Sequence, residues 1–165
     1  MKRLQLFAIS RLTILAKDLD SLAVVGGWVP ELVFPDKGHI GSLDVDLALD
    51  AQKLKPKAYE SIRKKLVDSG YQQSPEIANR FFRSIKGTPF QVRVDLITGE
   101  FPDVAAGGSH LLIQELAVWK ARGVDLAFAF QQEVSVEGVR PEGATTESPQ
   151  KCRLSPPTCA SRRSP

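Results

Sequence analysis

Long apolar runs are missing from this chain, and no stretch approaches the about 20 consecutive apolar residues that a membrane-spanning helix requires. Lys2 and Arg3 resemble the start of a signal peptide, but Arg11 and Lys17 interrupt any apolar core and no small-residue cleavage site follows. The sequence therefore predicts a cytoplasmic protein that does not enter a membrane.

Cysteine is also scarce. The chain has 2 cysteines, Cys152 and Cys159, and both fall near its C-terminal end. They have no histidine nearby and no second cysteine pair, so their spacing does not match a metal site. A disulfide is not expected in the cytosol either. We assign these cysteines no role.

Several well-known catalytic motifs are absent. The sequence contains no Gly-x4-Gly-Lys-Ser/Thr loop, no Gly-x-Ser-x-Gly elbow and no His-Glu-x2-His pair. These absences argue against a P-loop hydrolase, a serine hydrolase and a zinc protease. The formal charge is only +3, and residues 141–165 carry most of it, with four basic against two acidic side chains. Bulk charge therefore gives no reason to expect nucleic-acid binding.

The periodicity of apolar residues predicts an α+β fold in residues 1–140. We expect helices at 3–20, from Trp28 to Pro35, from Pro56 to Gly70 and at 109–122, and strands at 22–25, 43–49, 80–85, 90–97, 124–130 and 134–139. The two strands at 80–97 form an antiparallel hairpin across a four-residue loop. Trp28 is expected in the core.

Residues 141–165 differ in composition from the rest of the chain. They hold five of the 11 prolines, and Leu154 is their only large aliphatic side chain. Such a segment buries too little apolar surface to offset the entropy lost on ordering. We therefore expect a domain at 1–140 followed by a disordered tail at 141–165.

Three aspartates carry the most informative chemistry. Asp44 and Asp46 alternate with apolar residues on the strand at 43–49, so both carboxylates leave the same face of the sheet. Asp95 occupies the polar face of a second alternating strand and can add a third carboxylate. Such oxygen ligands suit Mg²⁺, which completes its coordination with water and phosphate oxygens. The alternative is a solvent-facing strand on which acids alternate without function.

The Gly26–Gly27 pair follows an apolar strand and precedes a helix. Backbone N–H groups in such a turn are accessible to a phosphate, and the dipole of the helix favours negative charge there. The same pair is equally typical of a tight strand-to-helix turn. Ser42, in the loop before the two-aspartate strand, is a further candidate for a hydrogen bond to phosphate.

The order of these motifs resembles the nucleotidyltransferase superfamily that includes DNA polymerase beta. The motifs are Val24-Val25-Gly26-Gly27-Trp28, Gly41-Ser42-Leu43-Asp44-Val45-Asp46-Leu47 and Val92-Arg93-Val94-Asp95-Leu96. Within that superfamily the chain is most similar to the AbiEii-type toxins of type IV toxin-antitoxin systems. The resemblance implies a mixed sheet flanked by helices, with the two-aspartate strand beside the third-aspartate strand. It also implies that a C-terminal helical part of the family is missing here.

The resemblance implies a role for each candidate residue. Asp44, Asp46 and Asp95 would bind Mg²⁺ or Mn²⁺, and Asp95 would help to activate the attacking hydroxyl. Gly26, Gly27 and Ser42 would contact the nucleotide. The substrates would be a nucleoside triphosphate and an unknown acceptor such as RNA or protein, and a cognate antitoxin would be a partner.

Two alternatives stay open at this point. An antibiotic nucleotidyltransferase of the aminoglycoside type would use the same residues on another hydroxyl acceptor. A catalytically inactive, shortened copy would bind metal or nucleotide without turnover. Neither the oligomeric state nor the preferred base follows from the sequence.

Overall fold

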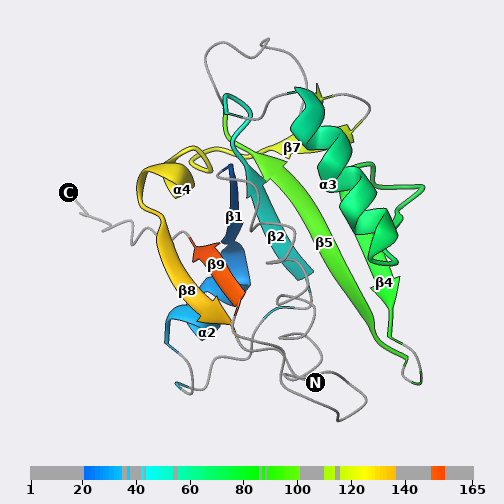
Figure 1. Cartoon of the computed structure of the whole chain (residues 1–165), viewed down its shortest axis with the longest axis horizontal. Helices are drawn as coiled ribbons and strands as arrows, with labels where there is room; N and C mark the ends of the chain where they lie inside the picture. Colours follow the sequence, from blue (N-terminus) through cyan, green and yellow to red (C-terminus); the bar gives the residue numbers. More distant parts are fainter. Residues whose placement is uncertain are drawn as a thin grey trace, which may run out of the picture.

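The computed structural model of this chain is a mixed β-sheet with helices beside it (Figure 1). The structure describes residues 21–34, 37, 42, 44–53, 56–85, 87, 89–100, 110–113, 116–136 and 150–154. The predicted α+β class is confirmed. The helix predicted at 3–20 lies outside the described residues.

Four strands form the part of the sheet that carries the three aspartates. They are β1 (Leu22–Val25), β2 (Asp44–Leu49), β4 (Arg80–Ser84) and β5 (Gln91–Thr98). Strand β2 is antiparallel to β1 and parallel to β5, while β4 is antiparallel to β5. The predicted hairpin is thus confirmed, and so is the expectation that the two strands bearing aspartates are neighbours.

Further strands extend the sheet on both sides. They are β3 (Gln72–Gln73) beyond β4, β6 (His110–Ile113), β7 (Leu116–Lys120), β8 (Gln132–Val136) and β9 (Gln150–Leu154). The main path across the sheet is β3-β4-β5-β2-β1-β9-β8, and β7 pairs with β5 and β6. Strand β4 pairs with β5 as far as Asp95 and β7 pairs from Ile97 onward, so one edge of β5 is shared by two strands.

Helices fill the connections between these strands. They are the 3-10 helix η1 (Gly26–Trp28), α2 (Val29–Val33), α3 (Pro56–Asp68) and α4 (Leu126–Ala129). The helices predicted after the glycine pair and from Pro56 are confirmed. Within the described part of the chain, none of the helices has the length and apolar character needed to span a membrane.

The core lies between the apolar face of the central strands and α3, which is drawn beside β5 and over β4 in Figure 1. Alternation along β2 and β5 sends every second side chain to this face. The buried set comprises Val45, Leu47, Leu49, Val92, Val94, Leu96, Phe81, and Ile62 and Leu66 from α3. Burying one such large side chain contributes about 1.5–3 kcal/mol. Trp28, which is 1% exposed, joins this core as predicted.

The prediction of a helix at 109–122 is wrong. That region forms the antiparallel strands β6 and β7. The spacing of Leu112, Leu116 and Trp119 fits a helical stripe, but Trp119 is 52% exposed whereas Val118 is buried, as strand alternation requires. Pairing of Trp119 with Ile97 at the end of β5 stabilises the strand, so tertiary pairing overrides the local pattern.

The strand predicted at 124–130 is also wrong, because residues 126–129 form the short helix α4. Short apolar runs do not distinguish a strand from a buried helix. Ala127 is buried while Leu126 and Phe130 are exposed. The next predicted strand is confirmed as β8, although residues 137–139 lie outside the described residues.

A disordered tail at 141–165 is contradicted for residues 150–154. They form β9, which lies between β1 and β8 and pairs with both. A ladder of backbone hydrogen bonds does not depend on large apolar side chains, so a segment poor in them can still complete a sheet. The sheet therefore crosses the boundary predicted at residue 140, and residues 150–154 belong to the same fold as β1.

Removing residues 141–165 should lower the free energy of unfolding by about 2 kcal/mol or more, because each hydrogen bond of the lost ladder contributes roughly 0.5–1.5 kcal/mol. Urea denaturation followed by circular dichroism measures this change. A matched deletion of residues 156–165 keeps β9 and should leave the midpoint unchanged. Equal stability of the two shortened chains would contradict the role of β9.

Candidate active site

Strands β2 and β5 bring the three predicted carboxylates to one face of the sheet. In their parallel register Asp46 lies opposite Asp95, and Asp44 lies opposite Arg93. Paired strands are about 4.8 Å apart, so Asp46 and Asp95 are direct neighbours. The alternating apolar residues Val45 and Val94 point to the opposite face and into the core. Asp44, Asp46 and Asp95 therefore lie on one face of the sheet, on the neighbouring strands β2 and β5.

The glycine turn lies against Asp46. Val25, the last residue of β1, is the register partner of Asp46, so the chain reaches Gly26 next to that carboxylate. A Cβ atom on Gly26 would overlap Oδ2 of Asp46, and the φ of +76° at Gly26 is unfavourable for residues with a side chain. The absence of a side chain at Gly26 thus allows both the left-handed turn and the close approach of the Asp46 carboxylate.

Gly27 and Ser42 form the other side of the same turn. A Cβ atom on Gly27 would lie 2.9 Å from Cβ of Ser42, which means that the turn approaches the segment before β2 very closely. The Ser42 hydroxyl donates a hydrogen bond to Oδ1 of Asp44. The backbone N–H of Asp44 points back at the Ser42 oxygen, at 3.5 Å. Ser42 therefore orients Asp44, a contact that the sequence did not predict.

Arg80 is a site residue that sequence reasoning missed. Its Nε donates to Oδ1 of Asp95 at 2.7 Å, and its Nη2 donates to Oδ2 at 2.7 Å. Such a bidentate pair is strong and fixes the plane of the carboxylate. A signal for it exists in the hairpin: closing the four-residue loop with Ile85 opposite Phe90 puts Arg80 opposite Asp95.

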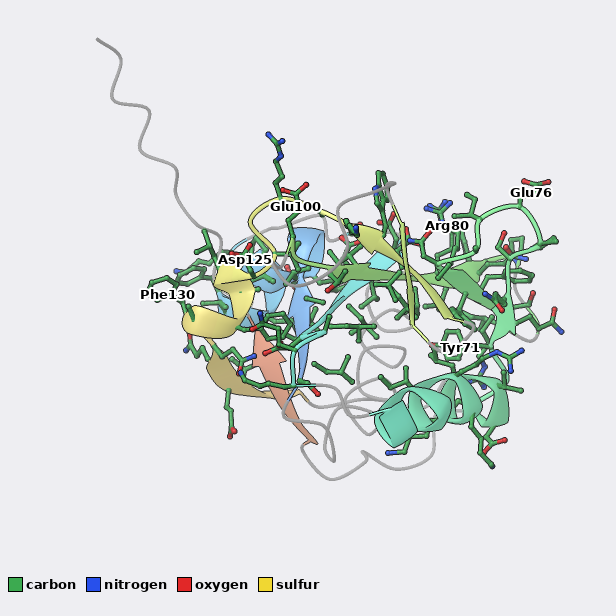
Figure 2. All side chains as sticks on the ribbon, turned by 90° about the horizontal axis from the view of Figure 1, so that it is seen from above. Tyr71, Glu76, Arg80, Glu100, Asp125 and Phe130 are labelled. Atoms are coloured by element: carbon green, nitrogen blue, oxygen red, sulfur yellow. The ribbon has the colours of Figure 1, made fainter. Side chains whose placement is uncertain are left out.

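Arg80 lies on the side of the sheet away from α3. Figure 2 shows this helix on one side of the strands, with Tyr71 next to it, and Arg80 on the other side. The face shared by Arg80 and the three aspartates is thus distinct from the face that forms the core with α3.

Crowding of negative charge changes the acidity of Asp46. Partial burial, together with the nearby charges of Asp44 and Asp95, raises the pKa of Asp46 from 3.8 to about 6, and the charge of Arg80 opposes this rise. The hydrogen bonds to Asp95 raise the pKa of Arg80 above its ordinary value, so this guanidinium stays charged. The closely bound cation Arg80 thus offsets only part of the negative charge of the three carboxylates.

The donor chemistry suits Mg²⁺ or Mn²⁺, which prefer carboxylate oxygens and need only one or two from the protein. Asp44 and Asp46 supply two such carboxylates from β2, and the Asp46 side chain lies against Gly26. Arg80 engages both oxygens of Asp95, and Ser42 engages Asp44. Among the described residues, no group of three Asp, Glu, His or Cys side chains is placed to hold a metal ion.

No family model, curated protein or solved structure was found that matches this chain. A function for it therefore follows from the residues and the geometry of the sheet face described above.

Proposed function

We propose that this chain is the core of a metal-dependent nucleotidyltransferase, which transfers a nucleoside monophosphate from a nucleoside triphosphate to an acceptor hydroxyl. The observation that supports this proposal is the register of β2 and β5, which sets Asp46 opposite Asp95 with Asp44 on the same face. The Gly26 turn supports it further, because the backbone approaches the Asp46 carboxylate closely there and backbone N–H groups in a glycine turn are accessible to a phosphate.

In the proposed reaction the acceptor oxygen attacks the α-phosphorus. A new P–O bond forms while the bond to the oxygen bridging the α- and β-phosphates breaks, and pyrophosphate leaves. We assign to Asp95, which Arg80 orients, the role of helping to activate the acceptor hydroxyl by accepting its proton. Mg²⁺ or Mn²⁺, when bound, would neutralise charge on the triphosphate and on the reacting oxygens. Asp44 and Asp46 would hold it, with Ser42 fixing the orientation of Asp44.

We further propose that the acceptor is a cellular RNA or protein and that the protein acts as a toxin of a type IV toxin-antitoxin pair. This part of the proposal comes from the resemblance of the three motifs to AbiEii-type proteins. Slowed growth on expression, relieved by a cognate antitoxin, supports it. Resistance to an aminoglycoside on expression would instead favour the antibiotic-modifying alternative.

Incubating the purified chain with α-³²P-labelled nucleoside triphosphates, Mg²⁺ or Mn²⁺, and total RNA or protein tests the transfer itself. The wild type should label an acceptor. Asp44→Ala should lower the labelling by at least about 100-fold, since even partners that only support a metal ligand contribute 10–100-fold. Asp68→Ala, on the exposed end of α3, is the matched control and should keep full activity.

Two results would contradict the proposal. One is the absence of labelled product with every acceptor and every nucleotide. The other is equal labelling by wild type and Asp44→Ala. Binding of a nucleotide without any product, measured by calorimetry on the same preparation, would favour the inactive alternative.

A further inference from the structure

The ion pair between Arg80 and Asp95 engages both oxygens of the Asp95 carboxylate. Both oxygens of Asp95 accept from the same guanidinium, each at 2.7 Å. The resemblance on which the proposed function rests implies that the Asp95 carboxylate binds a cation. A guanidinium that takes both oxygens in one plane stands where such a cation would need at least one of them.

The register of the sheet aligns three charges in one row. Arg80 lies opposite Asp95 across β4 and β5, and Asp46 lies opposite Asp95 across β5 and β2. A cation shared by Asp46 and Asp95 would therefore sit close to the guanidinium, and like charges at such short distances repel strongly. The guanidinium and the cation thus compete for one position.

The two partners differ in their freedom to move. The side chain of Arg80 is 26% exposed, whereas that of Asp95 is 13% exposed and belongs to a strand paired on both sides. Arg80 is thus the partner with more access to solvent, and we expect it to be the one that moves when the pair opens. A released guanidinium is a planar fork that matches the oxygens of a phosphate.

We propose that Arg80 is the counter-ion of Asp95 when no metal is bound. Arg80 holds Asp95 until a divalent cation takes its place, and the guanidinium then binds a phosphate of the nucleotide. Arg80 is thus a positioning residue that couples the two binding events. This inference rests on the proposed function for the identity of the ligands, and its own content is the exchange at Asp95.

Titrating Mn²⁺ alone into the whole chain, followed by electron paramagnetic resonance, measures the first half of the exchange. Arg80→Gln should bind Mn²⁺ roughly tenfold more tightly than the wild type, because the competing charge is gone. Arg83→Gln is the matched control. Arg83 lies on the same strand but on the opposite face, near Gly70, and its loss should leave the affinity for Mn²⁺ unchanged.

Binding of the α,β-methylene analogue of ATP in the presence of Mg²⁺ measures the second half. Arg80→Gln should weaken this binding roughly tenfold, as expected for loss of one charged phosphate contact. Arg80→Lys keeps the charge without the fork, so it should weaken the analogue less and should tighten Mn²⁺ only slightly. Tighter binding of Mn²⁺ together with weaker binding of the analogue in Arg80→Gln distinguishes a counter-ion from a residue that only orients Asp95.

If Arg80 only orients Asp95, Arg80→Gln should bind Mn²⁺ more weakly than the wild type, as Asp95→Asn should. That result would overturn the inference. An unchanged affinity for Mn²⁺ would overturn it too. If Arg80→Gln does not fold, the wild type supplies the answer. Exchange of the Arg80 Nε proton with water, followed by NMR, should accelerate when Mg²⁺ is added, and continued protection at saturating Mg²⁺ would refute the exchange.

Failure of this inference and failure of the proposed function give different results. Tighter Mn²⁺ binding by Arg80→Gln in a chain that labels no acceptor would keep the counter-ion and reject the transferase. Labelling that depends on Asp44, together with unchanged or weaker Mn²⁺ binding by Arg80→Gln, would keep the transferase and reject the counter-ion.

Discussion

Asp46→Asn should abolish nucleotide transfer while making the folded protein more stable at neutral pH. The carboxylate of Asp46 is partly buried beside Asp44 and Asp95, and its pKa is raised to about 6. Ionised Asp46 therefore destabilises the fold at pH 7, and a neutral amide of the same shape removes that cost. Transfer should fall by at least about 100-fold, because the same carboxylate is a proposed ligand of the cation.

The pH dependence gives this prediction a definite sign. A carboxyl group with a raised pKa in the folded state binds its proton more tightly there than in the unfolded chain. The stability that this proton contributes is fully present below the ordinary pKa of 3.8 and is lost as the pH rises through about 6. The advantage of Asp46→Asn over the wild type should thus grow between pH 4 and pH 6 and stay constant above.

Urea denaturation in the presence of a chelator measures this advantage without interference from metal. After allowance for screening by solvent we expect about 1–2 kcal/mol at pH 7. Asp68→Asn, at an exposed ion pair on α3, is the control and should change the stability by less than about 0.5 kcal/mol. A loss of stability in Asp46→Asn that is equal at pH 4 and pH 7 would refute the electrostatic account.

Gly26→Ala should inactivate the site at a modest cost in stability. The φ of +76° at Gly26 makes any side chain unfavourable by about 1–2 kcal/mol. The new methyl group would also overlap the end of the Asp46 side chain, which can rotate away. The relief of that overlap moves the carboxylate out of its position, so binding of Mn²⁺ and transfer should be lost together.

Gly87→Ala is a closely matched control for this prediction. Gly87 has a φ of +77°, and a Cβ atom there would meet nothing within 4 Å. Both variants should therefore lose a similar free energy of unfolding, whereas only Gly26→Ala should lose Mn²⁺ binding. Retained Mn²⁺ affinity in Gly26→Ala would show that the turn does not position Asp46.

The strands of the candidate site can be predicted from the sequence because their alternation is strict. In β2 the order Asp44-Val45-Asp46-Leu47 fixes both the element and its polar face, and a shift of one residue would bury both carboxylates. The order Arg93-Val94-Asp95-Leu96 does the same in β5. A segment with this period has one favourable orientation on a half-buried sheet, so local information suffices.

The contact that Arg80 makes with Asp95 depends on a neighbour that is distant in sequence. Arg80 reaches Asp95 only because β4 and β5 pair in one register, whereas Ser42 lies close to Asp44 along the chain. The pattern around Asp95 offers Arg93, two residues away on the same face, and does not indicate Arg80. Trp119 and its neighbours illustrate the same limit for secondary structure, since their pairing with β5 decides between strand and helix.

The place of β9 in the sheet has a consequence for the order in which the protein is made. Strands β1, β2, β4 and β5 lie within residues 22–98 and can pair as soon as they leave the ribosome. The outer edge of β1 must wait until residues 150–154 are synthesised, more than 120 residues after Val25. During that interval the nascent chain exposes an apolar strand edge, which is the kind of surface that chaperones bind and that aggregation exploits. The strands that carry the three aspartates can therefore assemble before the sheet beside them is closed.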